Sequence, residues 1–348
     1  IVALTFALLH RPLFSLLGAS DAVMAHVTPY ALWWALSFPF LVLMSILNAI
    51  FRARGDGVTA AVVMSAAAVL NIGLDPLLIF GLGPVPAMGT GGAGLATAIA
   101  RIVAVLGAIR WARRQGLLGT GGKLTEGLHD SARRIFRVGL PAAFSNAINP
   151  MGIAAVTAAV ATLGETAVAG FGAATRIQAL AFVPLLALSS GIGPVVGQNW
   201  GADRQDRAAR ATRDTFAMCL AYGAVLAAVL FFFAGTFAGW VASGEDDTAI
   251  AAQYLRIVGF SIFGYGILIT GNAALNARDR ALWSMGLSLA RIGLVYVPAA
   301  WVGVTVAGFG GIVWAAFAAN LAGAAAALWV ARRNRLFDMA GPAPKAPA

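Results

Sequence analysis

Few side chains in this sequence could do chemistry, and the most informative is an acid inside an apolar stretch. Asp75 lies within the stretch 58–81, and Arg101 lies at a similar depth in the next stretch, 92–112. If both stretches cross a membrane, a charge near the bilayer centre costs about 2.5–3.5 kcal/mol and needs a partner or a role. Two interpretations stay open. The two residues form a structural ion pair, or Asp75 titrates and binds a proton or a cation.

A second set of polar side chains lies in the apolar stretch 139–162. Asn146 and Asn149 are three residues apart and share one face of a helix, and Pro150 removes a backbone hydrogen bond beside them. Buried amides must find partners in lipid. They could hold helices together, or they could line a cavity that binds a ligand through amide and carbonyl oxygens.

Aromatic and basic residues in the second half extend this set. Phe182 and Tyr265 could face an aromatic cavity that attracts organic cations. Arg176 and Arg291 lie inside apolar stretches, whereas every acidic residue between positions 140 and 331 lies in a connection or at the end of a stretch. We therefore expect these arginines to bind backbone carbonyls or lipid head groups, with structural or gating roles.

Enzymatic chemistry finds no support in the remaining residues. The three histidines lie in connections or at the ends of apolar stretches and have no metal-ligand spacing, and Cys219 is the only cysteine. The glycines near Lys123 lack the spacing of a phosphate-binding loop. The sequence predicts no catalytic residue, no metal site and no cofactor.

The elements that position these residues are membrane helices. Hydrophobic residues make up 60% of the 348 residues and charged residues only 11%, against about 25% charged in soluble domains. Apolar runs of this length predict helices rather than the alternating strands of a barrel. We expect a partial span followed by nine further spans, at 1–17, 28–51, 58–81, 92–112, 139–162, 168–195, 213–241, 251–275, 282–304 and 308–331.

The basic residues lie between these spans and indicate how the chain is oriented. Most of the 24 Lys and Arg residues fall in alternate connections or in the tail after Arg332. The positive-inside tendency places these connections and the C-terminus in the cytoplasm. Because the basic residues form no patch, we expect no nucleic-acid partner.

The two halves of the chain are related by an internal repeat. Tyr254, Asn272 and Arg278 follow Tyr30, Asn48 and Arg54 at one constant offset of 224 residues, and a second match sets Trp111-Ala-Arg-Arg against Val330-Ala-Arg-Arg. Equivalent helix ends in the two halves are expected on the same side of the membrane, as in the parallel halves of several transporters. It predicts an N-terminal lobe at 1–115, a cytoplasmic linker at 116–137, a six-helix lobe at 138–334 and a cytoplasmic tail at 335–348.

The repeat also sets an expectation about missing sequence. The first block has four spans where the second has six, and the sequence opens inside an apolar stretch without a Met. We expect about two further spans before residue 1, and twelve spans in the complete protein.

Four stretches resemble the multidrug and toxic compound extrusion (MATE) transporters. They are Leu17-Gly-Ala-Ser-Asp with Tyr30; Arg54-Gly-Asp with Leu70-Asn-Ile-Gly-Leu-Asp-Pro-Leu-Leu-Ile-Phe-Gly; Gly91-Gly-Ala-Gly-Leu-Ala-Thr-Ala; and Gly197-Gln-Asn-Trp-Gly-Ala. The resemblance implies a two-lobed, twelve-helix antiporter with a central cavity, which exports amphipathic organic cations by alternating access.

The coupling ion follows from a departure from that family. Its sodium-coupled members place acids in the seventh and tenth helices, at positions that here fall on Asn149 and near Tyr265. We therefore expect proton coupling, through Asp75 or through an acid in the missing first helix.

The same resemblance implies a monomer in the bacterial inner membrane. Two alternatives remain: a flippase of related fold that moves a lipid-linked or polysaccharide substrate, whose cationic cavity would use Arg101, Arg176 and Arg291, and an integral membrane enzyme.

Overall fold

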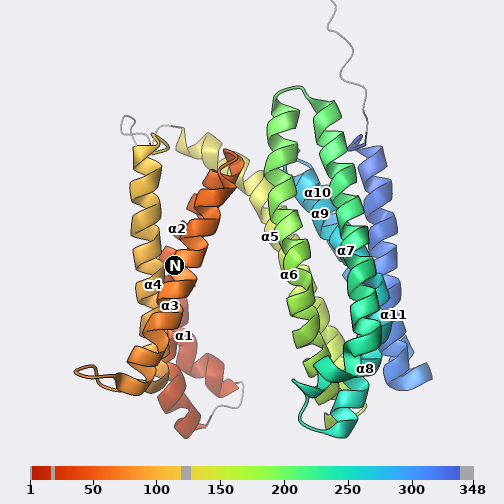
Figure 1. Ribbon diagram of the computed structural model, residues 1–348, viewed down its shortest axis with the longest axis horizontal. Helices are drawn as coiled ribbons and strands as arrows, with labels where there is room; N and C mark the ends of the chain where they lie inside the picture. The colour runs from red at the N-terminus through yellow and green to blue at the C-terminus, as the bar shows by residue number, and fades with distance from the viewer. Residues whose placement is uncertain (1, 17–19, 119–126, 338–348) are drawn as a thin grey trace, which may run out of the picture. The chain divides into compact units, whose positions relative to one another are not determined.

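The computed structural model describes residues 2–16, 20–118 and 127–337. Within these ranges every regular element is a helix, which confirms the expected all-α fold (Figure 1). The chain divides into two compact units, Ile1–Glu126 and Gly127–Ala348, which we call unit 1 and unit 2. The expected linker 116–137 and tail 335–348 lie partly outside the described residues.

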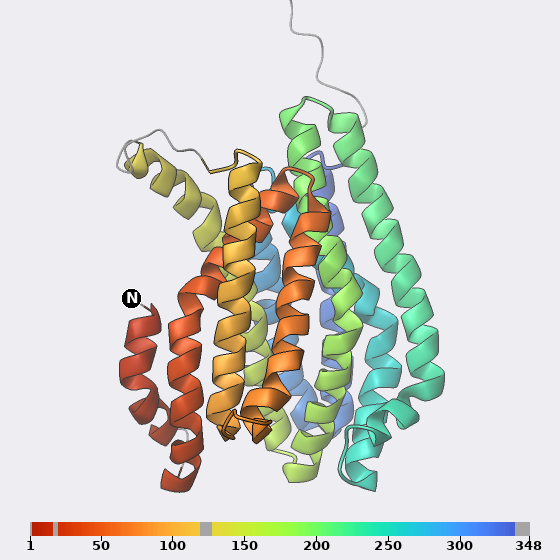
Figure 2. The same ribbon diagram turned by 60° about the vertical axis from the view of Figure 1, so that its left-hand side comes forward.

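Unit 1 is organised by the packing of α2 (Asp21–Ala53) along α4 (Gly89–Arg114). Small residues of α4 face α2, and a Cβ added at Gly94 would lie 3.0 Å from the Cβ of Trp33. Glycine and alanine therefore let the two backbones approach. The helix α1 (Val2–Leu16) lies beside the first half of α2 (Figure 2), where the rings of Phe6 and Trp34 are 5.1 Å apart.

The remaining helix of unit 1 carries the acid that the sequence singles out. This helix, α3 (Gly57–Pro76), packs on α4 and continues as the π-helical turn η1 (Leu77–Gly81) directly after Asp75 and Pro76. Asp56 caps its start by accepting a hydrogen bond from the Thr59 backbone N–H at 2.9 Å. Hydrogen bonds from Thr59 lower the pKa of the Asp56 carboxyl, so the cap stays ionised at neutral pH.

Unit 2 surrounds a helix that is interrupted in its middle. α8 (Glu245–Val258), the 3-10 turn η2 (Gly259–Ser261) and α9 (Ile262–Asn276) follow one another along this helix, which is mostly buried. α9 packs against α6 (Glu165–Gly201), α7 (Gln205–Gly239) and α11 (Val297–Arg333). Close packing against α11 requires glycine at position 264, because a Cβ there would overlap the carbonyl oxygen of Asn320.

A second interrupted helix packs beside α9. It consists of α10 (Ala281–Leu289), the π-helical turn η3 (Ala290–Tyr296) and the start of α11. α5 (Leu128–Ala161) lies against α10 and contains Pro141 and Pro150. Since π-helical turns occur often at functional sites, η3 indicates that a functional site could lie in this part of unit 2.

The observed helices match the expected spans. Eight helices in the described part of the chain are long and apolar enough to cross a membrane, and α1 is a shorter apolar helix. The longest candidate, Ala281–Arg333, is broken at Ala307 and Gly308, where Gly308 has φ +57°. This break separates the two spans expected at 282–304 and 308–331.

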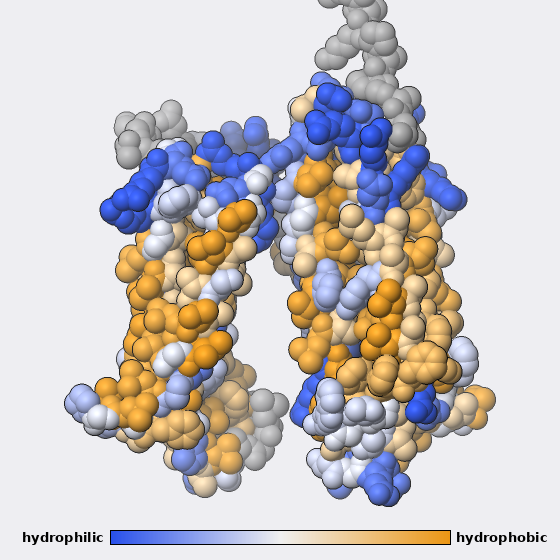
Figure 3. Space-filling model, in the orientation of Figure 1, coloured by the Kyte–Doolittle hydropathy of each residue, from blue (hydrophilic) through white to orange (hydrophobic). Residues whose placement is uncertain are grey.

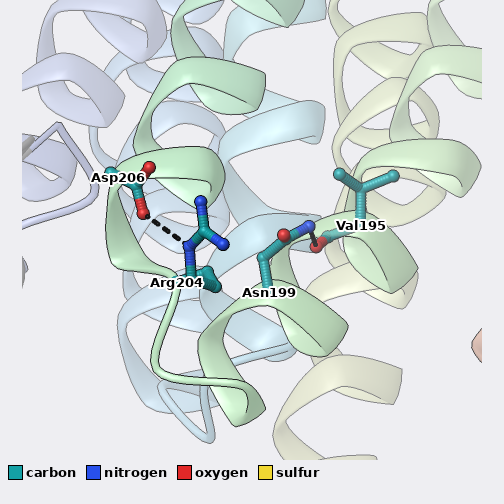
Figure 4. A network of polar contacts seen from close by, with 4 residues as sticks. All are labelled: Val195, Asn199, Arg204 and Asp206. Atoms are coloured by element: carbon teal, nitrogen blue, oxygen red, sulfur yellow. Dashed lines mark hydrogen bonds and ion pairs between the residues drawn. The ribbon is translucent and has the colours of Figure 1, made fainter.

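The surface of each unit is banded as expected for a membrane protein. Figure 3 shows an apolar middle on each unit and polar residues gathered at its upper end. In unit 2 this end includes the turn between α6 and α7, drawn in Figure 4. There Arg204 Nε and Asp206 Oδ1 are 3.4 Å apart, and the Asn199 side chain donates to the Val195 carbonyl at 2.8 Å. These contacts stabilise the connection between α6 and α7 at the surface of unit 2.

Candidate functional site

Most of the side chains singled out in the second half of the sequence line a cavity inside unit 2. It has a volume of about 310 Å³, near the lower end of the range of small-molecule sites. Its walls come from α5, α6, α9, α10 and η3. We call it the polar cavity, and its polar lining residues are Ser145, Asn146, Asn149, Ser189, Tyr265, Asn272, Asn276, Ser288 and Arg291.

Arg291 is the charged residue of the polar cavity. It lies in η3 and is only 8% exposed. Its Nη1 donates to Asn149 Oδ1 at 3.1 Å, and its Nη2 donates to Asn320 Oδ1 at 2.9 Å. The guanidinium carbon lies 4.9 Å from the centre of the Tyr265 ring, within the range of a cation–π contact. We call this part of the cavity the guanidinium end.

A chain of hydrogen bonds fixes the amide that holds Arg291. Ser261, in the turn η2, donates its hydroxyl proton to the Val258 carbonyl at 2.9 Å. Its oxygen therefore accepts from Asn320 Nδ2, at 2.9 Å, because a hydroxyl has one proton to give. Asn320 Oδ1 is left to face Arg291. Packing and hydrogen bonding thus hold the positively charged guanidinium of Arg291 in the wall of the polar cavity.

A second polar group lies at the other end of the cavity. The hydroxyl oxygens of Ser145 and Ser288 are 2.7 Å apart, and Asn272 Nδ2 donates to Ser288 Oγ at 3.0 Å. Asn276 lies one turn after Asn272 on α9. We call the group of Ser145, Asn272, Asn276 and Ser288 the amide end. None of the residues lining the polar cavity carries a carboxylate.

The sequence-predicted residues of unit 2 are only partly brought together. Asn146, Asn149, Pro150 and Tyr265 all line the polar cavity. Phe182 is not among the lining residues but stacks on Tyr265, with the ring centres 4.3 Å apart. Pro150 cannot bond to the carbonyl of residue 146, four positions earlier, which leaves that oxygen without its helical donor. The role of all five residues in binding stays a prediction.

The predicted arginines separate into different environments. Arg291 lines the polar cavity, whereas Arg176 on α6 is exposed and outside it. Arg101 belongs to unit 1 and donates from Nη1 to Ser37 Oγ at 2.7 Å. The three residues therefore do not build one cationic surface within either unit.

The expected ion pair between Asp75 and Arg101 is not formed, which corrects one of our two interpretations. Neither residue has an ionic partner in the described part of unit 1. Arg101 binds Ser37 instead, and Asp75 Oδ1 accepts a hydrogen bond from Asn71 Nδ2 at 3.3 Å. Asn71 lies four residues before Asp75 on α3 and satisfies the carboxylate locally. Asp75 is partly buried, so the second interpretation, a titrating acid, remains a prediction.

The sequence reasoning missed Asn320, although the repeat contained a signal for it. The offset that matches Trp111-Ala-Arg-Arg with Val330-Ala-Arg-Arg also sets Arg101 against Asn320. The other offset sets Ser37 against Ser261. Each unit forms the corresponding hydrogen bond. Arg101 donates to Ser37 Oγ at 2.7 Å in unit 1, and Asn320 donates to Ser261 Oγ at 2.9 Å in unit 2. The serines of the amide end gave no comparable signal, because serine is common in apolar helices.

Comparisons with known proteins agree with the architecture. The MatE family profile matches residues 1–77 and 141–302, which lie in units 1 and 2 respectively. The crystal structure of the Vibrio cholerae MATE transporter VcmN in the bent form is similar with a TM-score of 0.88 and 27% sequence identity. The match covers 96% of this chain and 75% of that chain.

Two sequence relatives extend the comparison. The FAD transporter of Shewanella oneidensis strain MR-1 is 32% identical over 324 residues, which cover 93% of this chain and 72% of that protein. The multidrug export protein MepA of Staphylococcus haemolyticus is 27% identical over 331 residues, which cover 92% and 71% of the two chains.

Fold and cavity together define a multi-pass membrane transporter. The chain belongs to the MatE family, which confirms the resemblance found in the sequence. The family and its structural neighbours are transporters rather than enzymes.

Proposed function

We propose that this protein is a secondary active exporter that moves small aromatic organic molecules across the membrane by alternating access. Membership of the MatE family supports transport, and the relative MepA is named as a multidrug export protein. The basic connections support a cytoplasmic C-terminus. Proton coupling remains the proposal for the driving ion, because no carboxylate lines the polar cavity and Asp75 lies in unit 1.

The substrate class that the polar cavity supports best is an aromatic molecule with anionic or hydrogen-bond-accepting groups. The observation that carries this proposal is Arg291, an 8% exposed guanidinium in a cavity without a carboxylate. Guanidinium groups bind carboxylates and phosphates strongly where water is scarce. The name of the Shewanella oneidensis relative, FAD transporter, supplies flavin adenine dinucleotide as the specific candidate.

This proposal differs from the organic cations that the family resemblance led us to expect. An aromatic ring face attracts cations, but the face of Tyr265 is already 4.9 Å from the Arg291 guanidinium. A cationic substrate in this cavity would therefore meet a like charge. Amphipathic cations remain the second candidate because Asp75, in unit 1, is a partly buried acid without an ionic partner in the described part of that unit.

The proposal is tested by transport in proteoliposomes that contain the full chain. FAD and ethidium are supplied in separate assays, with a proton gradient and then a sodium gradient imposed. We expect FAD transport driven by protons. We also expect Arg291→Gln to lower it about tenfold or more, since a hydrogen bond to a charged group contributes about 1.5–3 kcal/mol.

Arg176→Gln is the matched control, because it removes an arginine of the same unit that is exposed and outside the polar cavity. It should leave FAD transport near the wild-type rate. Transport of ethidium but not FAD would reject the anionic substrate in favour of the cationic candidate.

A further inference from the structure

The amide end of the polar cavity contains buried oxygen atoms that lack a hydrogen-bond donor. Asn272 is 8% exposed, and its buried Oδ1 has no hydrogen-bond partner among the residues that the structure describes. The buried Oδ1 of Asn276, a half-buried residue, likewise has none there. Both residues line the cavity. Buried polar atoms are nearly always paired with protein, water or a ligand. Two such acceptors one helical turn apart on α9 therefore mark a place where a hydrogen-bond donor is needed.

The neighbouring serines contact one atom of the Asn272 amide. Its Nδ2 donates to Ser288 Oγ at 3.0 Å, and Ser288 Oγ lies 2.7 Å from Ser145 Oγ. Ser145 Oγ also lies 3.4 Å from the Ser284 carbonyl oxygen. With Nδ2 bound to Ser288, Oδ1 is the atom of the Asn272 amide that remains as an acceptor at the cavity.

The guanidinium end has the opposite hydrogen-bonding character. Arg291 donates from Nη1 to Asn149 and from Nη2 to Asn320, and its buried Nε has no acceptor in the described part of the chain. A guanidinium has five N–H donors and no acceptor. One cavity thus carries unused donors at one end and unused acceptors at the other.

The two ends of the cavity contact α5 about one helical turn apart. Ser145 and Asn149, which contact the two ends, are four residues apart on α5, or about 6 Å at 1.5 Å per residue. Asn276 extends the amide end by another turn, about 6 Å. Tyr265 lines the cavity beside the guanidinium end, and the ring of Phe182 stacks on it at 4.3 Å.

We propose that the polar cavity binds a heteroaromatic ring with its acceptor edge on Arg291 and an N–H donor edge on Asn272 and Asn276. This inference rests on the proposed function and narrows its substrate class. Two groups of FAD could supply the donor edge, the imide N–H of the flavin ring or the amino group of adenine. An organic anion without an N–H donor would leave the amide oxygens unpaired and bind more weakly.

The test measures binding rather than transport, by isothermal titration calorimetry on the full chain in detergent. Two pairs of probes separate the two sources of the donor: riboflavin 5′-phosphate against its N3-methyl analogue, and AMP against its N6,N6-dimethyl analogue. We expect the unmethylated member of one pair to bind about tenfold more tightly, because an unsatisfied buried acceptor costs about 1–3 kcal/mol.

Variants test whether the difference in affinity between the unmethylated and methylated probes depends on the amide end. Asn272→Leu should abolish the difference in affinity between the unmethylated and methylated members of that pair. Asn276→Ala changes a less buried position and should reduce this difference in affinity. It replaces Asn272→Leu in the test if that variant does not fold. Asn48→Leu is the matched control, because Asn48 is the repeat equivalent of Asn272, also has a buried Oδ1 without a partner among the described residues, and lies outside the polar cavity. It should keep the full discrimination.

The outcomes separate this inference from the proposed function. If the probes bind, and Arg291→Gln weakens them, but neither pair shows discrimination, the donor edge is wrong and the anionic substrate stands. The inference also fails if Asn272→Leu and Asn276→Ala both keep the discrimination. If none of the four probes binds to the wild-type protein, both proposals are overturned.

Discussion

At the scale of single residues, the substrate binding that we propose for unit 2 depends on how one arginine is held. Arg291 is kept in place by two amide oxygens, and one of these belongs to Asn320, which is itself oriented by Ser261. Asn320 is 2% exposed and does not line the polar cavity. We therefore propose Asn320 as a positioning residue, which would act on a substrate only through Arg291.

The first prediction concerns this positioning residue. Asn320→Leu leaves Nη2 of Arg291 and the hydroxyl oxygen of Ser261 without their amide partner in a buried place. Loss of a partner to a buried charged group costs about 1–3 kcal/mol or more. We expect a fall of several degrees in the melting temperature of the solubilised protein, together with weaker FAD binding. Asn199→Leu is the control, since the Asn199 amide bonds only within its own helix. Equal melting temperatures for the two variants would contradict the role given to Asn320.

The sequence could identify several residues of the site but not their partners. A pair of amides beside a proline in an apolar helix predicts a polar face, and Asn146, Asn149 and Pro150 do lie together on the polar cavity. The bond from Arg291 to Asn149 joins residues 142 positions apart. It depends on the rotation of two helices about their axes, which a single sequence does not determine. The same limit explains why the sequence could not decide between an ion pair of Asp75 with Arg101, which is not formed, and separate partners for the two residues.

At the scale of elements, interrupted helices place the polar groups. The turns η2 and η3 carry Ser261 and Arg291, and α9 and α11 come close enough for Asn320 to reach both residues. The helices themselves could be predicted from apolar length, and the break at Gly308 from the glycine-rich sequence around it. The π-helical and 3-10 turns could not, because they arise from packing rather than from the composition of the segment.

The second prediction tests the close contact between α9 and α11. Gly264→Ala would place a Cβ against the Asn320 carbonyl, so the two helices must move apart or Asn320 must shift. We expect a lower melting temperature and weaker FAD binding from this single methyl group. Gly286→Ala is the matched control in α10, where a Cβ would meet no atom within 4 Å. It should be neutral or stabilising by about 0.5–1 kcal/mol, the usual gain of Ala over Gly in a helix. A loss of stability in both variants would show that the contact is not the cause.

At the scale of the whole molecule, the distribution of charge predicts orientation and coupling. The third prediction is that the polar end with most Lys and Arg faces the cytoplasm. A fluorescent protein fused after residue 348 should therefore be folded and bright in bacterial cells, whereas an alkaline phosphatase fused at the same place should be inactive. Fusions of the two reporters in the connection 240–244 provide the opposite control. A bright fusion there and an active phosphatase at the C-terminus would reverse the assignment.

The fourth prediction concerns the coupling ion. The polar cavity contains a fixed positive charge and no lining carboxylate, so a driving cation has no acid to bind there. Asp75 in unit 1 is partly buried and its described polar contact is to Asn71, a neutral amide that can stay bound whether the carboxyl is charged or not. We expect Asp75→Asn to abolish proton-driven accumulation of FAD in proteoliposomes while FAD counterflow, which needs no net ion movement, continues.

The comparison of the two assays distinguishes coupling from stability. A variant that is merely misfolded would lose accumulation and counterflow together, whereas an uncoupled transporter loses accumulation alone. Glu165→Gln is the control, because Glu165 is an exposed acid at the start of α6, and it should change neither assay. Full proton-driven accumulation by Asp75→Asn would exclude Asp75 as the coupling acid. Because the positive charge of Arg291 does not titrate at neutral pH, such a result would require an acid elsewhere in the protein to carry the proton.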